Sequence, residues 1–109
     1  MNIEMKQGER LIKEGAANLQ RNIETVGGKL YLTNQRLLFE AHKANVQRET
    51  TEIGLSDIHS TKKCWTKFLG FIPVMPNSLS VYTSQGNEYQ FVLFGRAEWA
   101  KEIVGQKNA

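Results

Sequence analysis

Apolar and polar residues alternate along most of the chain between residues 16 and 94, which is the period of half-buried β-strands. Glycine, asparagine and serine interrupt the alternation at short intervals, with Gly27-Gly28 and Asn34-Gln35 as the clearest turn signals. The pattern predicts seven strands, around residues 17–23, 29–33, 37–41, 51–55, 58–65, 79–81 and 89–93. We expect Gly27 and Gly28 to form a hairpin turn with positive φ.

The period changes after Arg96. Four apolar residues, Trp99, Ala100, Ile103 and Val104, then form one stripe of an amphipathic helix over about residues 96–105, with Gly105 as its expected end. Seven short strands followed by one helix predict a mainly β fold, in which the helix closes the open end of a barrel or sandwich.

The length of 109 residues predicts a single domain that can bury a core without disulfides or metal. The longest nearly unbroken apolar run, residues 68–76, is far short of the roughly 20 residues that cross a bilayer. The N-terminus mixes acids with bases and has no apolar stretch typical of a signal peptide. The single Cys64 makes neither an intramolecular disulfide nor a zinc site, so we expect a cytoplasmic protein without metal or cofactor.

The net charge of +3 is concentrated in one segment. Residues 1–57 carry eight basic and eight acidic side chains, and residues 78–109 carry three of each. Residues 58–77 carry Lys62, Lys63 and Lys67 and no acid, and they also hold the longest apolar run. A segment that is both basic and apolar suits an anionic, partly apolar surface such as a membrane. The other interpretation is that the apolar run plugs one end of the core and the lysines are ordinary solvated charges.

One stretch is specific enough to indicate a family. The run GGKLYLTNQRLLFE, residues 27–40, resembles the signature of GRAM domains, which belong to the pleckstrin-homology-like (PH-like) superfold. Weaker matches follow at residues 53–58, 79–81 and 89–93, so the resemblance covers about residues 9–105 of a single domain spanning residues 1–109. It implies a PH-like barrel of about seven antiparallel strands in two bent sheets, capped by the C-terminal helix, in a small stand-alone version that we expect to be bacterial. It also implies a non-catalytic adaptor that binds phosphoinositides, membranes or other proteins.

PH-like domains that bind inositol phosphates tightly place several basic side chains around the connection between their first two strands. Here residues 21–29 offer only Arg21 and Lys29, with Glu24 between them, so tight binding there is not expected. We instead expect the basic and apolar segment 62–76, which includes most of an apolar loop at residues 66–77, to bind an anionic membrane or phosphoinositide weakly, with Arg21 and Lys29 as additional contacts. The expected lipid-binding residues are Lys62, Lys63, Lys67, Phe68, Leu69, Phe71 and Ile72. Trp65 either lies at the membrane interface or covers the mouth of the barrel.

Other functions find less support. The same loop could serve a protein partner or a homodimer, whereas three basic residues and mostly aliphatic neighbours do not favour nucleic acid. No nucleophile, metal or phosphate-binding motif is present, and Cys64 is more typical of an unreactive strand thiol, so we expect no enzyme activity.

For Arg36 we expect a bracing ion pair with Glu40 or Asp57.

Overall fold

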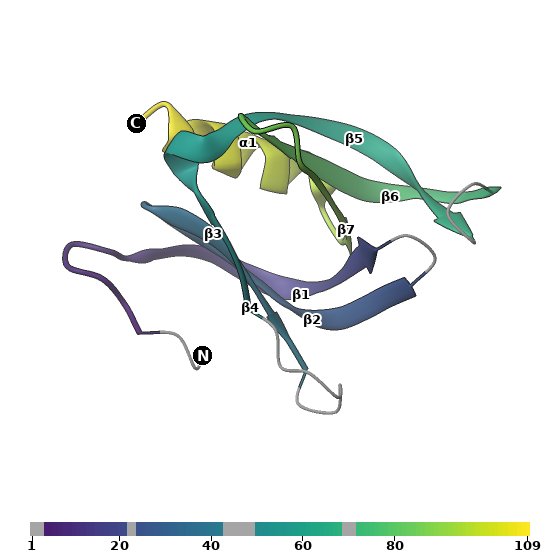
Figure 1. Cartoon of the computed structure of the whole chain (residues 1–109), viewed down its shortest axis with the longest axis horizontal. Helices are drawn as coiled ribbons and strands as arrows, with labels where there is room; N and C mark the ends of the chain where they lie inside the picture. Colours follow the sequence, from purple (N-terminus) through teal and green to yellow (C-terminus); the bar gives the residue numbers. More distant parts are fainter. Residues whose placement is uncertain (1–3, 22–23, 43–49, 69–71) are drawn as a thin grey trace.

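A computed structural model describes residues 4–21, 24–42, 50–68 and 72–109; for residues 21, 24, 67, 68, 72–74 and 76 it describes the backbone alone. Seven strands are followed by one helix: β1 (Leu11–Arg21), β2 (Glu24–Thr33), β3 (Arg36–Ala41), β4 (Thr50–Gly54), β5 (Ile58–Phe68), β6 (Ile72–Thr83), β7 (Glu88–Leu93) and α1 (Arg96–Lys107). A short 3₁₀ turn, η1 (Leu55–Asp57), joins β4 to β5. All seven strands are antiparallel to their neighbours, in the order β4-β3-β2-β1-β7-β6-β5 (Figure 1). The prediction of a mainly β fold with seven antiparallel strands and a C-terminal helix is confirmed.

The sequence predicted two bent sheets, but the seven strands form one continuous sheet. This sheet has two halves, β1–β4 and β5–β7. They are joined by a short ladder in which residues 17–20 of β1 pair with residues 90–93 of β7. β1 pairs with β2 along almost its whole length, from Leu11 to Arg21. The narrow joint lets the β5–β6–β7 half fold over the β1–β4 half, as Figure 1 shows. The alternating side chains of both halves therefore face one another.

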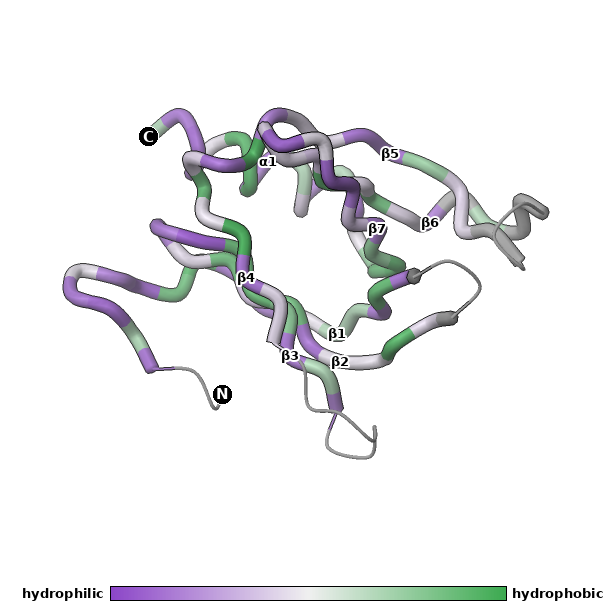
Figure 2. Tube along the Cα trace, in the orientation of Figure 1, coloured by the Kyte–Doolittle hydropathy of each residue, from purple (hydrophilic) through white to green (hydrophobic). Residues whose placement is uncertain are grey.

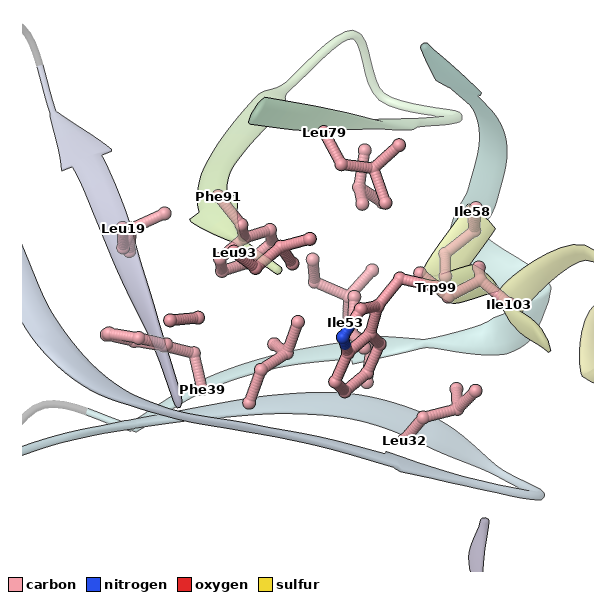
Figure 3. Close-up of a cluster of buried hydrophobic side chains, with 14 of the residues drawn as sticks. Leu19, Leu32, Phe39, Ile53, Ile58, Leu79, Phe91, Leu93, Trp99 and Ile103 are labelled. Atoms are coloured by element: carbon pink, nitrogen blue, oxygen red, sulfur yellow. The ribbon is translucent and has the colours of Figure 1, made fainter. Parts of the chain in front are cut away.

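The space between the halves is filled by the residues that the alternation predicts. Phe39 and Phe91 come from opposite halves, and their ring centroids lie 5.8 Å apart. Trp99 of α1 reaches into the same cluster (Figure 3). The remaining core side chains are Ala17, Leu19, Leu30, Leu32, Leu37, Ala41, Ile53, Leu55, Ile58, Leu79, Val81, Leu93 and Ile103.

Helix α1 covers the open end of this cluster and packs against η1, β5 and β6. Trp99 and Ile103 are buried as predicted, and each contributes about 1.5–3 kcal/mol by full burial. The predicted stripe is wrong at its edge, since Val104 is exposed. The predicted stop is also wrong: the helix runs through Gly105 to Lys107. Tertiary contacts of Trp99 and Ile103 fix the helix, so the weak helix propensity of one glycine does not end it.

The predicted hairpin turn at Gly27-Gly28 is wrong, because both glycines lie inside β2. Gly28 is required there by close packing. A Cβ at Gly28 would lie 2.3 Å from the carbonyl oxygen of Glu40 and 2.7 Å from Cζ of Phe39. Gly28 thus marks a close approach of β3 to β2, which is a common reason for glycine within a strand.

Before β1, residues 4–10 form a segment that we call the N-terminal strap. Figure 2 shows that it is mostly polar. It is attached to the β2–β3 turn by side-chain hydrogen bonds: Asn34 Nδ2 donates to the carbonyl of Gly8 at 3.0 Å, and the backbone N–H of Arg10 donates to Asn34 Oδ1 at 2.8 Å. Gln35 Nε2 donates to the carbonyl of Gln7 at 2.9 Å. The Asn34-Gln35 turn predicted from the sequence therefore exists, and it also holds the strap.

Candidate functional site

The far ends of β5 and β6 extend beyond the rest of the sheet. β7 pairs with β6 only over residues 78–82, so residues 72–77 of β6 have β5 as their only strand partner within the described chain. We call residues 65–68 and 72–77 the β5–β6 arm; Lys62 and Lys63 lie at its base. Figure 1 shows the arm projecting past β7. This corrects the predicted apolar loop at residues 66–77, because most of that segment is strand.

Two prolines shape the arm. The register of β5 against β6 shifts between Cys64 and Thr66 and again between Thr66 and Lys67, opposite Pro76 and Pro73. Proline has no backbone N–H to donate, so a ladder that contains it commonly adopts a bulge. Both prolines lie in the part of the apolar run that the structure describes as strand, residues 72–76.

Side-chain hydrogen bonds replace the missing ladder contacts. The Thr66 hydroxyl donates to Asn77 Oδ1 and lies 2.6 Å from the Ser78 hydroxyl. Gln90 Nε2, from β7, donates to the carbonyl of Trp65 at 3.0 Å. Arg96, at the start of α1, donates from Nη1 to the carbonyl of Cys64 at 2.8 Å. The base of the arm is therefore anchored to both β7 and the helix.

The predicted binding residues divide into three groups. Lys62 and Lys63 are exposed and have no ion pair within the described residues. Lys67, Phe68 and Ile72 lie in the arm, where the backbone alone is described. Leu69 and Phe71 fall outside the described residues.

Two apolar side chains of this region are largely exposed. Trp65 is 49% exposed and Met75 is 54% exposed. Trp65 is not part of the core cluster, whose open end α1 covers. Met75 belongs to the apolar run of residues 68–76, in which no sequence feature distinguishes it from its neighbours.

The other two expected basic contacts, Arg21 and Lys29, lie in β1 and β2. Lys29 is paired with Glu14 at 2.9 Å, and its pKa is raised by this hydrogen bond. Arg21 ends β1, and its side chain is not described. Lys29 would have to leave Glu14 to contact a lipid.

Arg36 forms an ion-pair cluster that the sequence did not reveal. Its guanidinium donates from Nε to Glu9 Oε2 at 2.8 Å, from Nη2 to Glu9 Oε1 at 2.9 Å and from Nη1 to Glu52 Oε1 at 2.8 Å. The prediction that Arg36 pairs with Glu40 or Asp57 is therefore wrong. Glu9 lies in the N-terminal strap, 27 residues away in sequence, so no local spacing identifies it.

The two central side chains of this cluster, Arg36 and Glu9, are buried. The side chain of Glu9 is 0% exposed and that of Arg36 is 7% exposed. Hydrogen bonds, chiefly from Arg36 and also from Lys6 and Thr33, lower the pKa of Glu9 from 4.5 to about 2, even though burial alone would raise it. Burial also opposes ionisation of Glu52, but hydrogen bonds from Arg36 and Lys6 lower its pKa. The cluster fixes the strap to β3 and β4, and its charges are used within the fold.

Two further observations concern the described residues alone. No helix among them is long and apolar enough to cross a membrane. No group of three or more His, Cys, Asp or Glu side chains among them is placed to hold a metal ion.

Comparison with protein families decides the classification. The model of the GRAM domain matches residues 1–106, nearly the whole chain. The chain belongs to the GRAM-domain family. A comparison with curated proteins found no match to this GRAM domain.

Solved structures support the same fold for this GRAM domain. It is similar to the C-terminal domain of an unknown protein from Leishmania infantum, with a TM-score of 0.76 at 15% identity over 94% of this chain and 88% of that chain. The Vps36 N-terminal PH domain matches with a TM-score of 0.70 at 15% identity over 96% and 83%. The Slm1 PH domain, solved in complex with phosphoserine, matches with a TM-score of 0.67 at 14% identity over 91% and 97%. At such low identity these likenesses establish a PH-like fold.

Proposed function

We propose that this GRAM domain is a non-catalytic adaptor that binds anionic membrane lipid or phosphoinositide weakly, as a peripheral protein, through the β5–β6 arm and its base. GRAM and PH-like domains often bind lipids or proteins, so the proposal concerns which surface acts and on what. The observation that carries it is a combination: Lys62 and Lys63 at the base of the arm are exposed without an ion pair among the described residues, and Trp65 and Met75 in the arm are about half exposed.

Unpaired lysines next to exposed apolar side chains suit the boundary between headgroups and acyl chains. The ammonium groups remain among anionic headgroups while the apolar groups enter the boundary. Trp65 suits this level, because its ring is apolar and its N–H stays hydrated. Elsewhere in the described chain, Lys6, Lys13, Lys29 and Arg36 already face carboxylates.

The expected affinity is low. Lys62, Lys63 and Lys67 contribute about 1 kcal/mol each near an anionic leaflet. Partial burial of apolar side chains adds roughly 2–4 kcal/mol. The total before ordering costs corresponds to a Kd between about millimolar and micromolar. Stable attachment would need a second signal or several copies.

Sedimentation with vesicles of neutral and of anionic composition, at low and at high salt, tests the proposal. We expect anionic vesicles to bind preferentially and salt to weaken the binding. The Lys62→Gln/Lys63→Gln variant should bind about 30-fold more weakly, from the loss of about 2 kcal/mol. As a charge-matched control, Arg10→Gln/Lys101→Gln removes two exposed charges elsewhere and should bind within about twofold of wild type. Equal loss in both variants, or no binding to any vesicle, would reject the arm as a membrane site.

The exposure of Trp65 and Met75 also supports a second candidate, a protein partner that buries the arm. This interaction would depend less on salt and would need no lipid. Trp65→Ser would then abolish capture of that partner, while vesicle binding would be absent from the start.

A further inference from the structure

A hollow of about 260 Å³ lies on the outer face of the sheet, where β1, β6 and β7 meet. Ala17 and Leu93 belong to the core cluster, so the alternation places Ala16, Asn18, Val92 and Phe94 on the opposite face. The full lining is Ala16, Ala17, Asn18, Gly28, His42, Asn77, Val92, Leu93 and Phe94. Small residues of β1 and β2 make the hollow possible.

Asn18 and His42 form one wall. Both stand beside Gly27, where an added Cβ would lie 3.2 Å from Asn18 Oδ1 and 3.3 Å from His42 Cδ2. Asn77 contributes a second amide, and its oxygen is held by the Thr66 hydroxyl. The rim therefore offers hydrogen-bonding side chains from three strands or strand ends.

Phe94 stands at the rim and is 93% exposed, more than any other large hydrophobic side chain described. Single exposed apolar residues are common and need no explanation by themselves. Here, however, a protruding aromatic ring and an empty hollow share one face. A surface that carries both a projection and a matching recess is self-complementary, which is the requirement for a two-fold interface.

Size and charge favour a second copy as the occupant. The hollow is below the range of roughly 300–1,000 Å³ typical of small-molecule sites, and one aromatic side chain is a closer match. None of the lining residues is an acid, a lysine or an arginine. The adjacent Lys29 is neutralised by Glu14 at 2.9 Å. Two copies of a protein of net charge +3 can therefore meet on this face without opposing unpaired lysines.

We propose that the chain forms a two-fold homodimer in which Phe94 of each copy fills the hollow beside Ala16 of the other. This contact is separate from the β5–β6 arm, so it does not depend on the membrane proposal.

Sedimentation equilibrium over a range of protein concentrations tests the dimer with three variants. Phe94→Ser removes the projection, and Ala16→Phe fills the hollow from an exposed strand position where an aromatic residue is well tolerated. Each should weaken dimerisation by roughly a hundredfold or more, because both symmetry-related contacts are lost. Val104→Ser, an exposed apolar residue of α1, is the control and should dimerise as wild type does.

A mixture of two variants makes the test specific. Phe94→Ser retains an open hollow and Ala16→Phe retains the ring, so the mixture should form a heterodimer with one of the two contacts restored. Neither variant alone should dimerise at that concentration. A wild-type chain that stays monomeric at its highest soluble concentration, a Phe94→Ser variant that dimerises normally, or a mixture without heterodimer would each overturn the proposal.

The two proposals fail independently. Lys62→Gln/Lys63→Gln should dimerise as wild type does, since neither lysine lines the hollow. Phe94→Ser should retain the vesicle binding of a single copy. Loss of dimerisation in the lysine variant would overturn the Phe94 interface.

Discussion

Around Arg36, where the N-terminal strap meets β3 and β4, charged side chains face one another, whereas at the base of the β5–β6 arm they are exposed to solvent. Arg36 contacts two carboxylates and Lys6 pairs with Glu52 at 3.4 Å. Lys62 and Lys63 have no such partner among the described residues. The first set of charges stabilises the fold. The second set contributes little to it and is available to an external surface.

The difference is clearest where a buried charge loses its partner. Arg36→Met leaves the Glu9 carboxylate, which is 0% exposed, without its guanidinium. We expect the free energy of unfolding to fall by about 3–5 kcal/mol, as measured by urea denaturation. Lys29→Met removes an exposed pair with Glu14 and serves as the control, with an expected loss below about 1 kcal/mol. Equal losses would contradict the distinction between the buried cluster and the surface pair.

Lowering the pH tests the same cluster in the wild-type protein, because it protonates Glu9 without a substitution. The pKa of Glu9 lies at about 2 in the fold, below its ordinary value of 4.5. Its contribution to stability is therefore complete above about pH 4.5 and disappears as the pH falls toward about 2. The contribution is on the order of 3 kcal/mol. Denaturant unfolding at a series of pH values should show this loss in wild type and a shallower one in Glu9→Gln; identical slopes in the two proteins would count against it.

The smallest effect is expected at the base of the arm. Lys62→Gln/Lys63→Gln should change the free energy of unfolding by less than about 0.5 kcal/mol, because neither side chain has a partner to lose. Thermal and urea unfolding would measure it alongside vesicle binding, where the same variant should have a clear defect. A substantial loss of stability would mean that these lysines belong to the fold, as the charges of the strap do.

The fold was largely predictable from the sequence because local alternation determines which residues face the core. A period of two in the strand predicted over residues 37–41 places Leu37 and Phe39 on one face, and both are buried. The errors arose where a distant contact overrides a local signal. Gly28 looks like a turn residue, but it is a glycine because β3 approaches β2 closely. Gly105 looks like a helix end, but burial of Ile103 holds the helix beyond it.

The candidate site was predictable only as a segment. A basic, apolar stretch without acids located the region, and the sequence alone indicated Lys62 and Lys63. It did not distinguish strand from loop, because the bulges opposite Pro73 and Pro76 depend on pairing with β5. Nor did it single out Phe94, whose neighbours Ala16 and Asn77 are distant in sequence. The partner of Arg36 was missed for the same reason.

The arm has a consequence for how such a domain can diversify. Beyond β7 its two strands pair mainly with each other, so residues can be added to both without disturbing the core. One further residue in each strand would lengthen the hairpin by about 3.4 Å and turn every side chain beyond the insertion to the opposite face. Two further residues in each strand would return those side chains to their original face. The reach of the hairpin can therefore be tuned in steps of two residue pairs, with the scaffold left unchanged.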